Sequence, residues 1–359
     1  MPGSERHSLA TSPLVGEVDA RSASGEGEAA KPPVSSGNES PSPQPLPRQG
    51  GGAKEPSTSD VDHSKIRRTL LKGLAVSAGA LASAHLSVAL ASPAVSPKST
   101  MPSAGRLKQS VCRWPYNRYP LPEFCRRARQ SGLAAIDLLY ADEWTVAADA
   151  GLVVSMGYPA RRDKFIETGF NDPANHAALI KELEVALPLA ARAKVPNVIA
   201  MFGNRSAGID ESAAVANCVT GLAKIAPLAQ ELGVNICVEL LNSKVDHAGY
   251  QGDHTAFGVA VAKGVNSPRV KLLYDIYHMQ IMEGDVIRTI RDNIKWIGHF
   301  HTGGVPGRHE IDDTQELNYH AIAAAIADLG YQGYVAHEFV PTRADPFASL
   351  AEAVRICSV

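Results

Sequence analysis

The chain has 359 residues, with 35 Lys and Arg against 37 Asp and Glu, and its formal net charge at pH 7 is −2. This near balance provides no basic stripe for nucleic acid, so binding to a polyanion is not expected. Five cysteines lie far apart without a C-x-x-C pair, which argues against a disulfide framework and against a thiolate zinc site.

Residues 1–64 are rich in Pro, Ser, Gly, Glu and Ala and almost lack aromatic side chains. Such a segment cannot bury enough apolar surface to offset its ordering entropy, so we expect it to be disordered. No Met occurs between Met1 and Met101. An alternative is therefore that translation starts at a non-Met codon near Val61 and that the preceding stretch is not made.

Residues 65–91 have the order of an export signal. The run Ile66-Arg67-Arg68-Thr69-Leu70-Leu71-Lys72 precedes a mildly apolar stretch and two A-x-A triplets at 82–84 and 89–91. It resembles the twin-arginine consensus, which implies the twin-arginine machinery as a partner and a periplasmic or otherwise exported product. A stable membrane anchor over 70–91 is the alternative, which Lys72 and the many small residues disfavour. Residues 92–108 are then a linker.

From residue 109 to residue 359 apolar runs alternate with helical patterns, which favours βα units around a parallel sheet. Eight candidate strands predict a closed (β/α)8 TIM barrel of about 250 residues. An open doubly wound sheet is the rival fold, but no glycine-rich phosphate loop follows the first strand. The predicted strands are 110–114, 134–139, 152–157, 197–202, 234–240, 270–275, 294–301 and 334–339. The predicted helices are 175–193, 211–232, 253–264, 285–293, 319–329 and 347–356, with a short one between the second and third strands, and with Gly132, Gly233 and Gly330 as left-handed caps.

Four acidic or imidazole residues stand at the ends of the last four predicted strands: Glu239, Asp275, His301 and Glu338. The carboxyl ends of parallel barrel strands converge on one face, so these side chains are expected to meet. Unpaired charges so near a core would be costly, and a shared cation would neutralise them. Three carboxylates and one imidazole suit Mg²⁺ or Mn²⁺, and less well Co²⁺ or Zn²⁺.

The motifs around these residues resemble the xylose-isomerase-like barrels, and within them the hydroxypyruvate isomerase group. The matching runs are 273–280, 298–301, 306–310 and 333–338, and the resemblance covers residues 111–359. It implies that the four strand-end residues bind a divalent metal and that Glu239 and Glu338 also transfer a proton. The implied reaction converts a small hydroxy-carbonyl compound through an enediolate, with hydroxypyruvate to tartronate semialdehyde as the first expectation.

Two further residues are expected to bind the substrate. His278 resembles the family histidine that contacts a substrate oxygen, and Arg308 can hold a carboxylate or hydroxyl in a forked contact. A structural hydrogen bond for His278 and a solvated side chain for Arg308 are the alternatives. Glu310 is a candidate to orient Arg308 or His309.

Neighbouring positions have expected places from strand parity and loop length. His299 is expected to point into the barrel one layer below His301, and His337 to face the helices. The polar loop 242–251 is a candidate substrate lid, with Lys244 and His247 as its residues of interest. The candidates for the opposite wall of the site are Arg113 and Trp114, and Cys237 is expected to fill the barrel below Glu239.

Two features favour other substrates. His301 stands where a Gln is expected in bacterial hydroxypyruvate isomerases, and an export signal fits poorly with intracellular glyoxylate metabolism. A ketose 3-epimerase or a related exported sugar isomerase is the alternative. A metal-dependent phosphoesterase would need further ligands and a basic surface, and a sugar-binding barrel would need a dead metal site. The sequence leaves the metal, the substrate, signal cleavage and homo-oligomerisation open.

Overall fold

The computed structural model describes residues 105–359. The expected disordered segment 1–64, the export signal 65–91 and most of the linker 92–108 lie outside these residues. The described part is built on one parallel sheet. Its first strand begins at Lys108, one residue before the expected start of the barrel at residue 109. Its strands are β1 (Lys108–Cys112), β2 (Ala135–Asp137), β3 (Val153–Val154), β4 (Asn197–Met201), β5 (Asn235–Leu240), β6 (Val270–Asp275), β7 (Ile297–Thr302) and β8 (Tyr334–His337).

The sheet closes into a barrel. Its strands follow the order β3-β2-β1-β8-β7-β6-β5-β4, and each pairs with its neighbours in parallel. Gly157, just after β3, closes the gap to β4: its N–H donates to the Asn197 carbonyl at 2.9 Å and its carbonyl accepts from the Ile199 N–H at 3.1 Å. A Cβ at Gly157 would lie 2.6 Å from the Trp144 ring, so only glycine fits there. The predicted (β/α)8 TIM barrel is confirmed.

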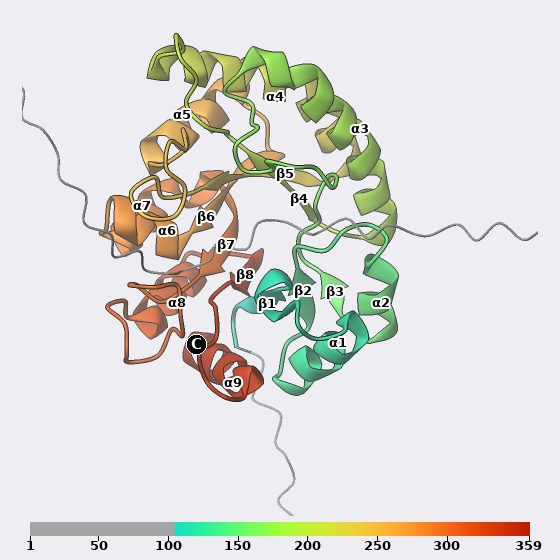
Figure 1. Ribbon diagram of the computed structural model, residues 1–359, viewed down its shortest axis with the longest axis vertical. Helices are drawn as coiled ribbons and strands as arrows, with labels where there is room; N and C mark the ends of the chain where they lie inside the picture. Colours follow the sequence, from blue (N-terminus) through green and yellow to red (C-terminus); the bar gives the residue numbers. More distant parts are fainter. Residues whose placement is uncertain (1–104) are drawn as a thin grey trace, which may run out of the picture. The chain divides into compact units, whose positions relative to one another are not determined.

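Helices surround the barrel as an outer ring (Figure 1). α4 begins where the Asp210 side chain accepts from the Ala213 N–H and ends at Gly233, whose φ is +71°. By length and composition α4 could also span a membrane, but it packs between α3 and α5. The helices are α1 (Leu121–Gln130), α2 (Trp144–Asp149), α3 (His176–Ala193), α4 (Glu211–Leu232), α5 (Thr255–Val265), α6 (Ile276–Met282), α7 (Val286–Asn293), α8 (Tyr319–Asp328) and α9 (Pro346–Cys357).

The differences from the predicted elements are local. α6 was not predicted, and α1 was expected only as a helix without bounds that Gly132 follows. β7 starts at Ile297 because residues 294–296 form a 3-10 turn. β2 and β3 are shorter than the apolar runs that contain them, because Leu138 has a φ of +56° and interrupts the regular ladder before Leu139 and Gly157 form an isolated parallel bridge. Gly132 and Gly330 have φ of +95° and +71°, as expected of residues that follow helix ends.

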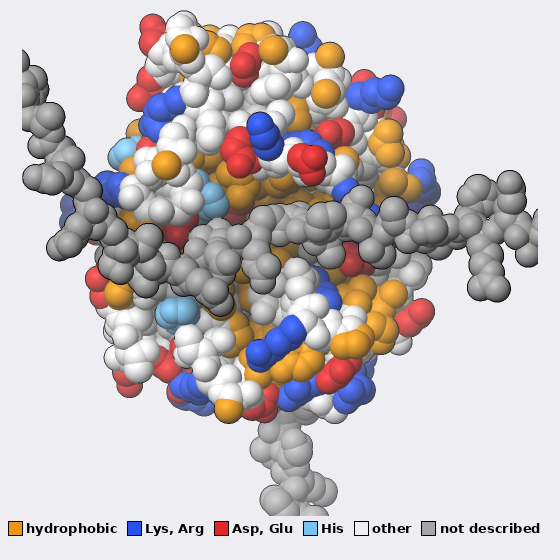
Figure 2. All heavy atoms as spheres, in the orientation of Figure 1, with side chains coloured by type: hydrophobic (Ala, Val, Ile, Leu, Met, Phe, Trp, Pro, Cys, Tyr) orange, Lys and Arg blue, Asp and Glu red, His pale blue; other side chains and the backbone are white. Residues whose placement is uncertain are grey.

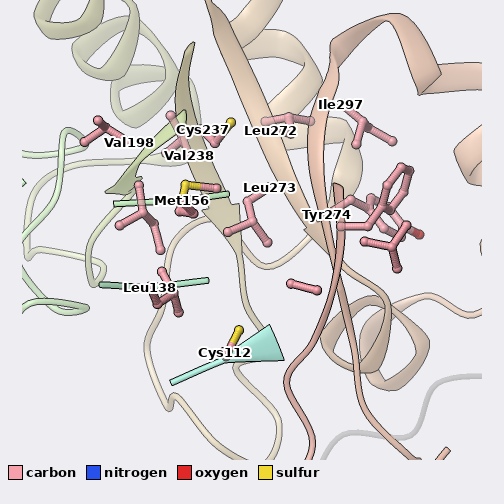
Figure 3. Close-up of a cluster of buried hydrophobic side chains, with 14 of the residues drawn as sticks. Cys112, Leu138, Met156, Val198, Cys237, Val238, Leu272, Leu273, Tyr274 and Ile297 are labelled. Carbon is pink, nitrogen blue, oxygen red and sulfur yellow. The ribbon is translucent and has the colours of Figure 1, made fainter. Parts of the chain in front are cut away.

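Alternation along the strands separates two buried layers (Figure 3). On β6, Leu272 faces the helices, because a Cβ at Gly258 of α5 would lie 2.8 Å from it. Residues of the opposite parity point into the barrel. Cys237 is one of them: it is fully buried, and its Sγ lies 3.6 Å from Oδ1 of Asn197. This parity directs Glu239, two residues further along β5, to the carboxyl-end mouth of the barrel.

Candidate metal and active site

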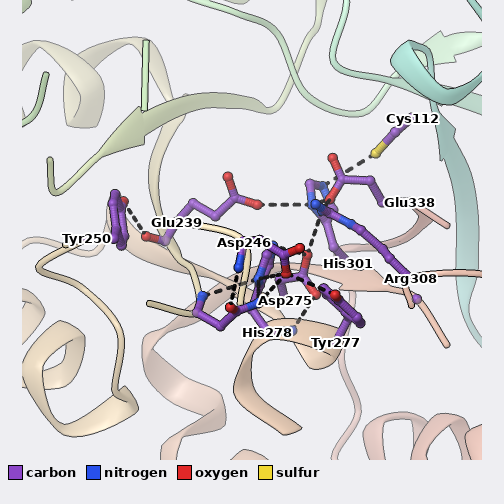
Figure 4. Close-up of polar contacts among 12 residues, drawn as sticks. Cys112, Glu239, Asp246, Tyr250, Asp275, Tyr277, His278, His301, Arg308 and Glu338 are labelled. Carbon is purple, nitrogen blue, oxygen red and sulfur yellow. Dashed lines mark hydrogen bonds and ion pairs between the residues drawn. The ribbon is translucent and has the colours of Figure 1, made fainter. Parts of the chain in front are cut away.

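The four strand-end side chains meet at the mouth of the barrel (Figure 4). One potential ligand atom from each of Glu239, Asp275, His301 and Glu338 lies within 4.8 Å of all the others. Nδ1 of His301 is 2.7 Å from Oε2 of Glu338 and 3.2 Å from Oε1 of Glu239. All four residues are at most 5% exposed. β5, β6 and β7 each supply one of them, and Glu338 directly follows β8.

Arg308 is the cation that the structure places against this cluster. Its Nη2 lies 3.2 Å from Asp275 and 2.6 Å from Glu338. The guanidinium also lies 5.3 Å from the ring centres of Trp114 and Tyr277, which flank it. The Arg308 carbonyl accepts from the Val340 N–H at 2.7 Å, which ties the loop after β7 to the loop after β8. Nε of Arg308 is buried and has no hydrogen-bond partner among the described residues.

His278 is held beside the cluster by α6. Asp275 caps this helix, because its Oδ1 accepts from the His278 N–H at 3.2 Å, while its Oδ2 faces the cluster and accepts from Arg308. Nδ1 of His278 accepts from the Asn242 backbone N–H at 3.2 Å. Nε2 therefore carries the proton of the neutral ring, and within the described part of the chain this buried N–H has no hydrogen-bond partner.

Burial and mutual repulsion perturb the titration of the cluster. Burial raises the pKa of Asp275 to about 7 against the attraction of Arg308. It also raises the pKa of Glu239, although the contact with His301 opposes that shift. Burial acts in the same direction on Glu338, but there the attraction of His301 and Arg308 holds the pKa well below its usual range. Three buried carboxylates thus compete for the positive charge of two side chains.

The donor set fits a hard divalent cation. It offers carboxylate oxygens and one imidazole nitrogen, the buried Nδ1 of His301, whose polar neighbours are the oxygens of Glu338 and Glu239. Mg²⁺ and Mn²⁺ prefer such oxygen-rich sites, and Zn²⁺ tolerates them. A second group of ligand-type side chains shares His301 and consists of Cys112, Asp137 and His301.

Of the two candidates for the opposite wall, only Trp114 reaches the site. Its indole N–H donates to Oε1 of Glu338 at 2.6 Å. Arg113 turns away and donates to the carbonyls of Tyr116 and Tyr119 at 2.5 and 2.6 Å. These two bonds fix the turn after β1 and leave its guanidinium no reach toward the cluster.

Of the two candidates in the loop 242–251, only His247 lies near the site. Lys244 donates to the carbonyls of Ile281 and Met282, so it caps the end of α6 rather than facing the mouth. The His247 ring lies 5.3 Å from the His278 ring, and its Nε2 is a buried atom without a hydrogen-bond partner in the described part of the chain.

Glu310 does not orient Arg308 or His309. Its carboxylate instead accepts hydrogen bonds from Thr342, the Arg343 N–H and Ser349, and it fastens the loop between β8 and α9.

His299 and His337 lie where strand parity placed them. Nε2 of His299 is 2.7 Å from Asp137 inside the barrel. His337 contacts Gln109, which in turn donates to the Val354 carbonyl on α9.

Sequence reasoning missed three supporting residues. Asp137 lies against both barrel histidines, Asn242 holds His278, and the Tyr250 hydroxyl donates to the Glu239 carbonyl at 2.9 Å. Only Asp137 left a signal in the sequence, since it is the one acid within the apolar run 134–139. A lone acid inside a buried strand needs a partner, but the run does not say which.

The fold and the cluster define a class of protein: a (β/α)8 barrel with an acid and imidazole centre at the carboxyl ends of its strands. The model of one family, described as "Xylose isomerase-like TIM barrel", matches residues 119–357. The chain belongs to this family.

Curated relatives carry isomerase and epimerase names. A 2-oxo-tetronate isomerase of Cupriavidus necator is 37% identical over 141 residues, which is 39% of this chain and 54% of that protein. A putative hydroxypyruvate isomerase of Homo sapiens is 30% identical over 62% of this chain and 84% of its own length. A D-psicose 3-epimerase of Agrobacterium fabrum is 31% identical over 55% of this chain and 68% of its own length.

Solved structures share the fold. A family 2 AP endonuclease from Brucella melitensis superimposes with a TM-score of 0.61 at 25% identity, covering 68% of this chain and 98% of that one. A 3-keto-D-glucoside 4-epimerase from E. coli gives 0.59 at 19% identity, covering 70% and 100%.

Proposed function

We propose that this protein is a divalent-metal-dependent isomerase that moves a proton between adjacent carbons of a small α-hydroxy carbonyl compound. The isomerase class is supported by the relatives that align with the barrel. The observation that carries the proposal is the placement of two glutamates, Glu239 on β5 and Glu338 after β8, on either side of His301 at 3.2 and 2.7 Å. A substrate carbon between them has a carboxylate on each side.

The metal is held in this proposal by Glu239, Asp275, His301 and Glu338, with Mg²⁺ or Mn²⁺ as the expected ion. When bound, it supplies a positive charge next to the substrate oxygens, where an enediolate becomes negative.

The protein side chains perform the proton transfer. A carboxylate oxygen of Glu239 or Glu338 removes the proton from the hydroxyl-bearing carbon, a glutamate returns a proton to the adjacent carbon, and the proton of the substrate hydroxyl passes to the former carbonyl oxygen. The free Nε2–H of His278 donates to a substrate oxygen. Trp114 and Tyr277 flank Arg308 and exclude water from its guanidinium.

The substrate in this proposal is hydroxypyruvate, which is converted to tartronate semialdehyde. Hydroxypyruvate and 2-oxo-tetronate are both 3-hydroxy-2-oxo acids, and both occur in the names of relatives. The unpartnered Nε–H of Arg308 suits the carboxylate that such acids carry.

A ketose 3-epimerase is the second candidate. Proton removal on one face and return on the other needs a base on each side of the carbon, which the two glutamates provide. The similarity to a D-psicose 3-epimerase supports it, as does the imidazole at position 301.

The test is substrate profiling of the Mn²⁺-loaded protein. Hydroxypyruvate, 2-oxo-tetronate and a set of ketoses are each incubated in D₂O, and the product and its deuterium content are read by NMR. Turnover of the oxo acids supports the isomerase, whereas turnover of ketoses alone reverses the order of the two candidates. Glu239→Gln and Glu338→Gln should each abolish exchange, while Glu231→Gln, on the exposed side of α4, is the matched control.

We also propose export through the twin-arginine route. It is supported by the run 66–72 and the two A-x-A triplets. Cell fractionation of the full chain tests it. Substitution of Arg67 and Arg68 together by Lys should retain the protein in the cytoplasm, and export of that double variant would overturn the proposal.

A further inference from the structure

A buried carboxylate lies behind the imidazole of the metal cluster. Asp137, the last residue of β2, is 0% exposed. Its Oδ1 is 3.5 Å from Nε2 of His301, and its Oδ2 is 2.7 Å from Nε2 of His299. The Ser155 hydroxyl donates to the same Oδ2 at 2.6 Å. Asp137 therefore lies at the edge of the His301 ring opposite to the one that faces Glu239 and Glu338.

We propose that Asp137 is a positioning residue that turns Nδ1 of His301 toward the metal cluster. The inference rests on the proposed role of His301 as a ligand. A neutral imidazole has one N–H and one lone pair, and a carboxylate can only accept the N–H. With Asp137 beside Nε2, the proton stays on Nε2 and the lone pair stays on Nδ1, where the other three ligand atoms are.

The contacts of Asp137 fix its own orientation. Ser155 and His299 both engage Oδ2, so a rotation of the carboxylate would break two contacts at once. Oδ1 is thereby left for His301. These contacts also offset the cost of a charge inside the barrel, where a carboxylate without partners would be unfavourable.

Cys112 is the competing neighbour of the same nitrogen. Its Sγ lies 3.7 Å from Nε2 of His301 and 3.9 Å from Oδ1 of Asp137. A thiol is a weak hydrogen-bond acceptor. The carboxylate is the stronger acceptor for this N–H.

Asp137→Asn is the direct test. The amide keeps the shape but can donate to Nε2, which favours the ring form that carries its proton on Nδ1. Calorimetric titration with Mn²⁺ should show an affinity about 10- to 100-fold weaker than in the native chain, with an unchanged far-UV circular dichroism spectrum. NMR of the Mg²⁺-loaded, ¹⁵N-histidine-labelled proteins should show the Nε2–H resonance of His301 in the native chain and not in Asp137→Asn. Native affinity in a folded Asp137→Asn chain would overturn the proposal.

Two further variants keep the test decisive. Cys112→Ala should bind Mn²⁺ like the native chain, and a loss there without a loss in Asp137→Asn would assign the orientation to the thiol instead. Ser155→Ala keeps the charge and releases Oδ2, so it should weaken Mn²⁺ binding in the same direction but less. It replaces Asp137→Asn if that variant does not fold, and native affinity in it would then overturn the proposal.

The titration of the native chain separates this proposal from the proposed function. Two Mn²⁺ ions per chain would assign Asp137 to a second metal site with Cys112 and overturn the positioning role. One ion per chain, weakened in Asp137→Asn, supports positioning even if no hydroxy-carbonyl compound is turned over, in which case only the reaction is wrong.

Discussion

Tyr250→Phe tests whether the stability of the barrel beneath the site depends on the Tyr250 hydroxyl. This hydroxyl accepts from the Phe202 N–H at 2.9 Å and donates to the Glu239 carbonyl at 2.9 Å, and both Tyr250 and Phe202 are 0% exposed. Removing it leaves the N–H of Phe202 buried without this partner, which costs about 1–3 kcal/mol. With about 2–4 °C lost per kcal/mol for a domain near this size, a loss of 2 kcal/mol lowers Tm by about 4–8 °C.

The assay is thermal unfolding followed by circular dichroism on the metal-free and the Mn²⁺-loaded chain, with kcat measured in parallel. kcat should fall as well, because the backbone of Glu239 loses the hydroxyl that links it to Phe202, just after β4. Tyr119→Phe is the control, since the Tyr119 hydroxyl makes no hydrogen bond within residues 105–359. A Tm within about 1 °C of the native value for Tyr250→Phe would refute the reasoning.

Three more outcomes follow from the same contacts. Burial raises the pKa of Glu310, but the hydrogen bonds from Ser349 and Thr342 outweigh burial and lower this pKa to about 2. The stability that the Glu310 carboxylate contributes is therefore present above about pH 4.5 and is lost as the pH falls toward 2. The free energy of unfolding in urea should accordingly depend less on pH in this window for Glu310→Gln than for the native chain. Arg308→Met should lower kcat/KM for an oxo acid about 10- to 150-fold, from about 1.5–3 kcal/mol for a hydrogen bond to a charged group, and unchanged kcat/KM would contradict substrate binding by Arg308. Mn²⁺ at 100 times its Kd should stabilise the chelator-treated protein by about 2.7 kcal/mol, and an unchanged Tm would rule out a metal site.

Much of the fold was predictable because its signals are local. The apolar runs of β4 to β8 and the long helical patterns of α3 and α4 are visible in the sequence, and their observed bounds lie within a few residues of those predicted. α6 escaped prediction because Asp275 starts it directly at the end of a strand, without any intervening loop. β2 and β3 were predicted too long because the left-handed backbone of Leu138, which residue type does not reveal, interrupts their ladder before the isolated bridge between Leu139 and Gly157.

The site was predictable only in its strand-end members. Glu239, Asp275, His301 and Glu338 share one position relative to their strands, and that position repeats along the sequence. Asp137 is also the last residue of its strand, but this was hidden in the sequence because it lies in the middle of the predicted strand 134–139.

The directions of the loop side chains could not be predicted from the sequence either. Arg113 and Lys244 were expected near the site, but each donates to backbone carbonyls of a nearby turn or helix end. Local carbonyl acceptors compete with a distant site, and residue type alone does not decide between them.

The two contacts of Asp275 restrict which substitutions could change the metal preference of the four-residue cluster. One of its oxygens starts α6 and thereby places His278, while the other faces the metal cluster. Replacing it with His or Cys to suit a softer ion would also displace the imidazole of His278. Position 301 is restricted in a different way: its side chain belongs to no helix cap, but Nε2 of His301 faces the buried carboxylate of Asp137, so replacing the imidazole there would also call for a change at Asp137.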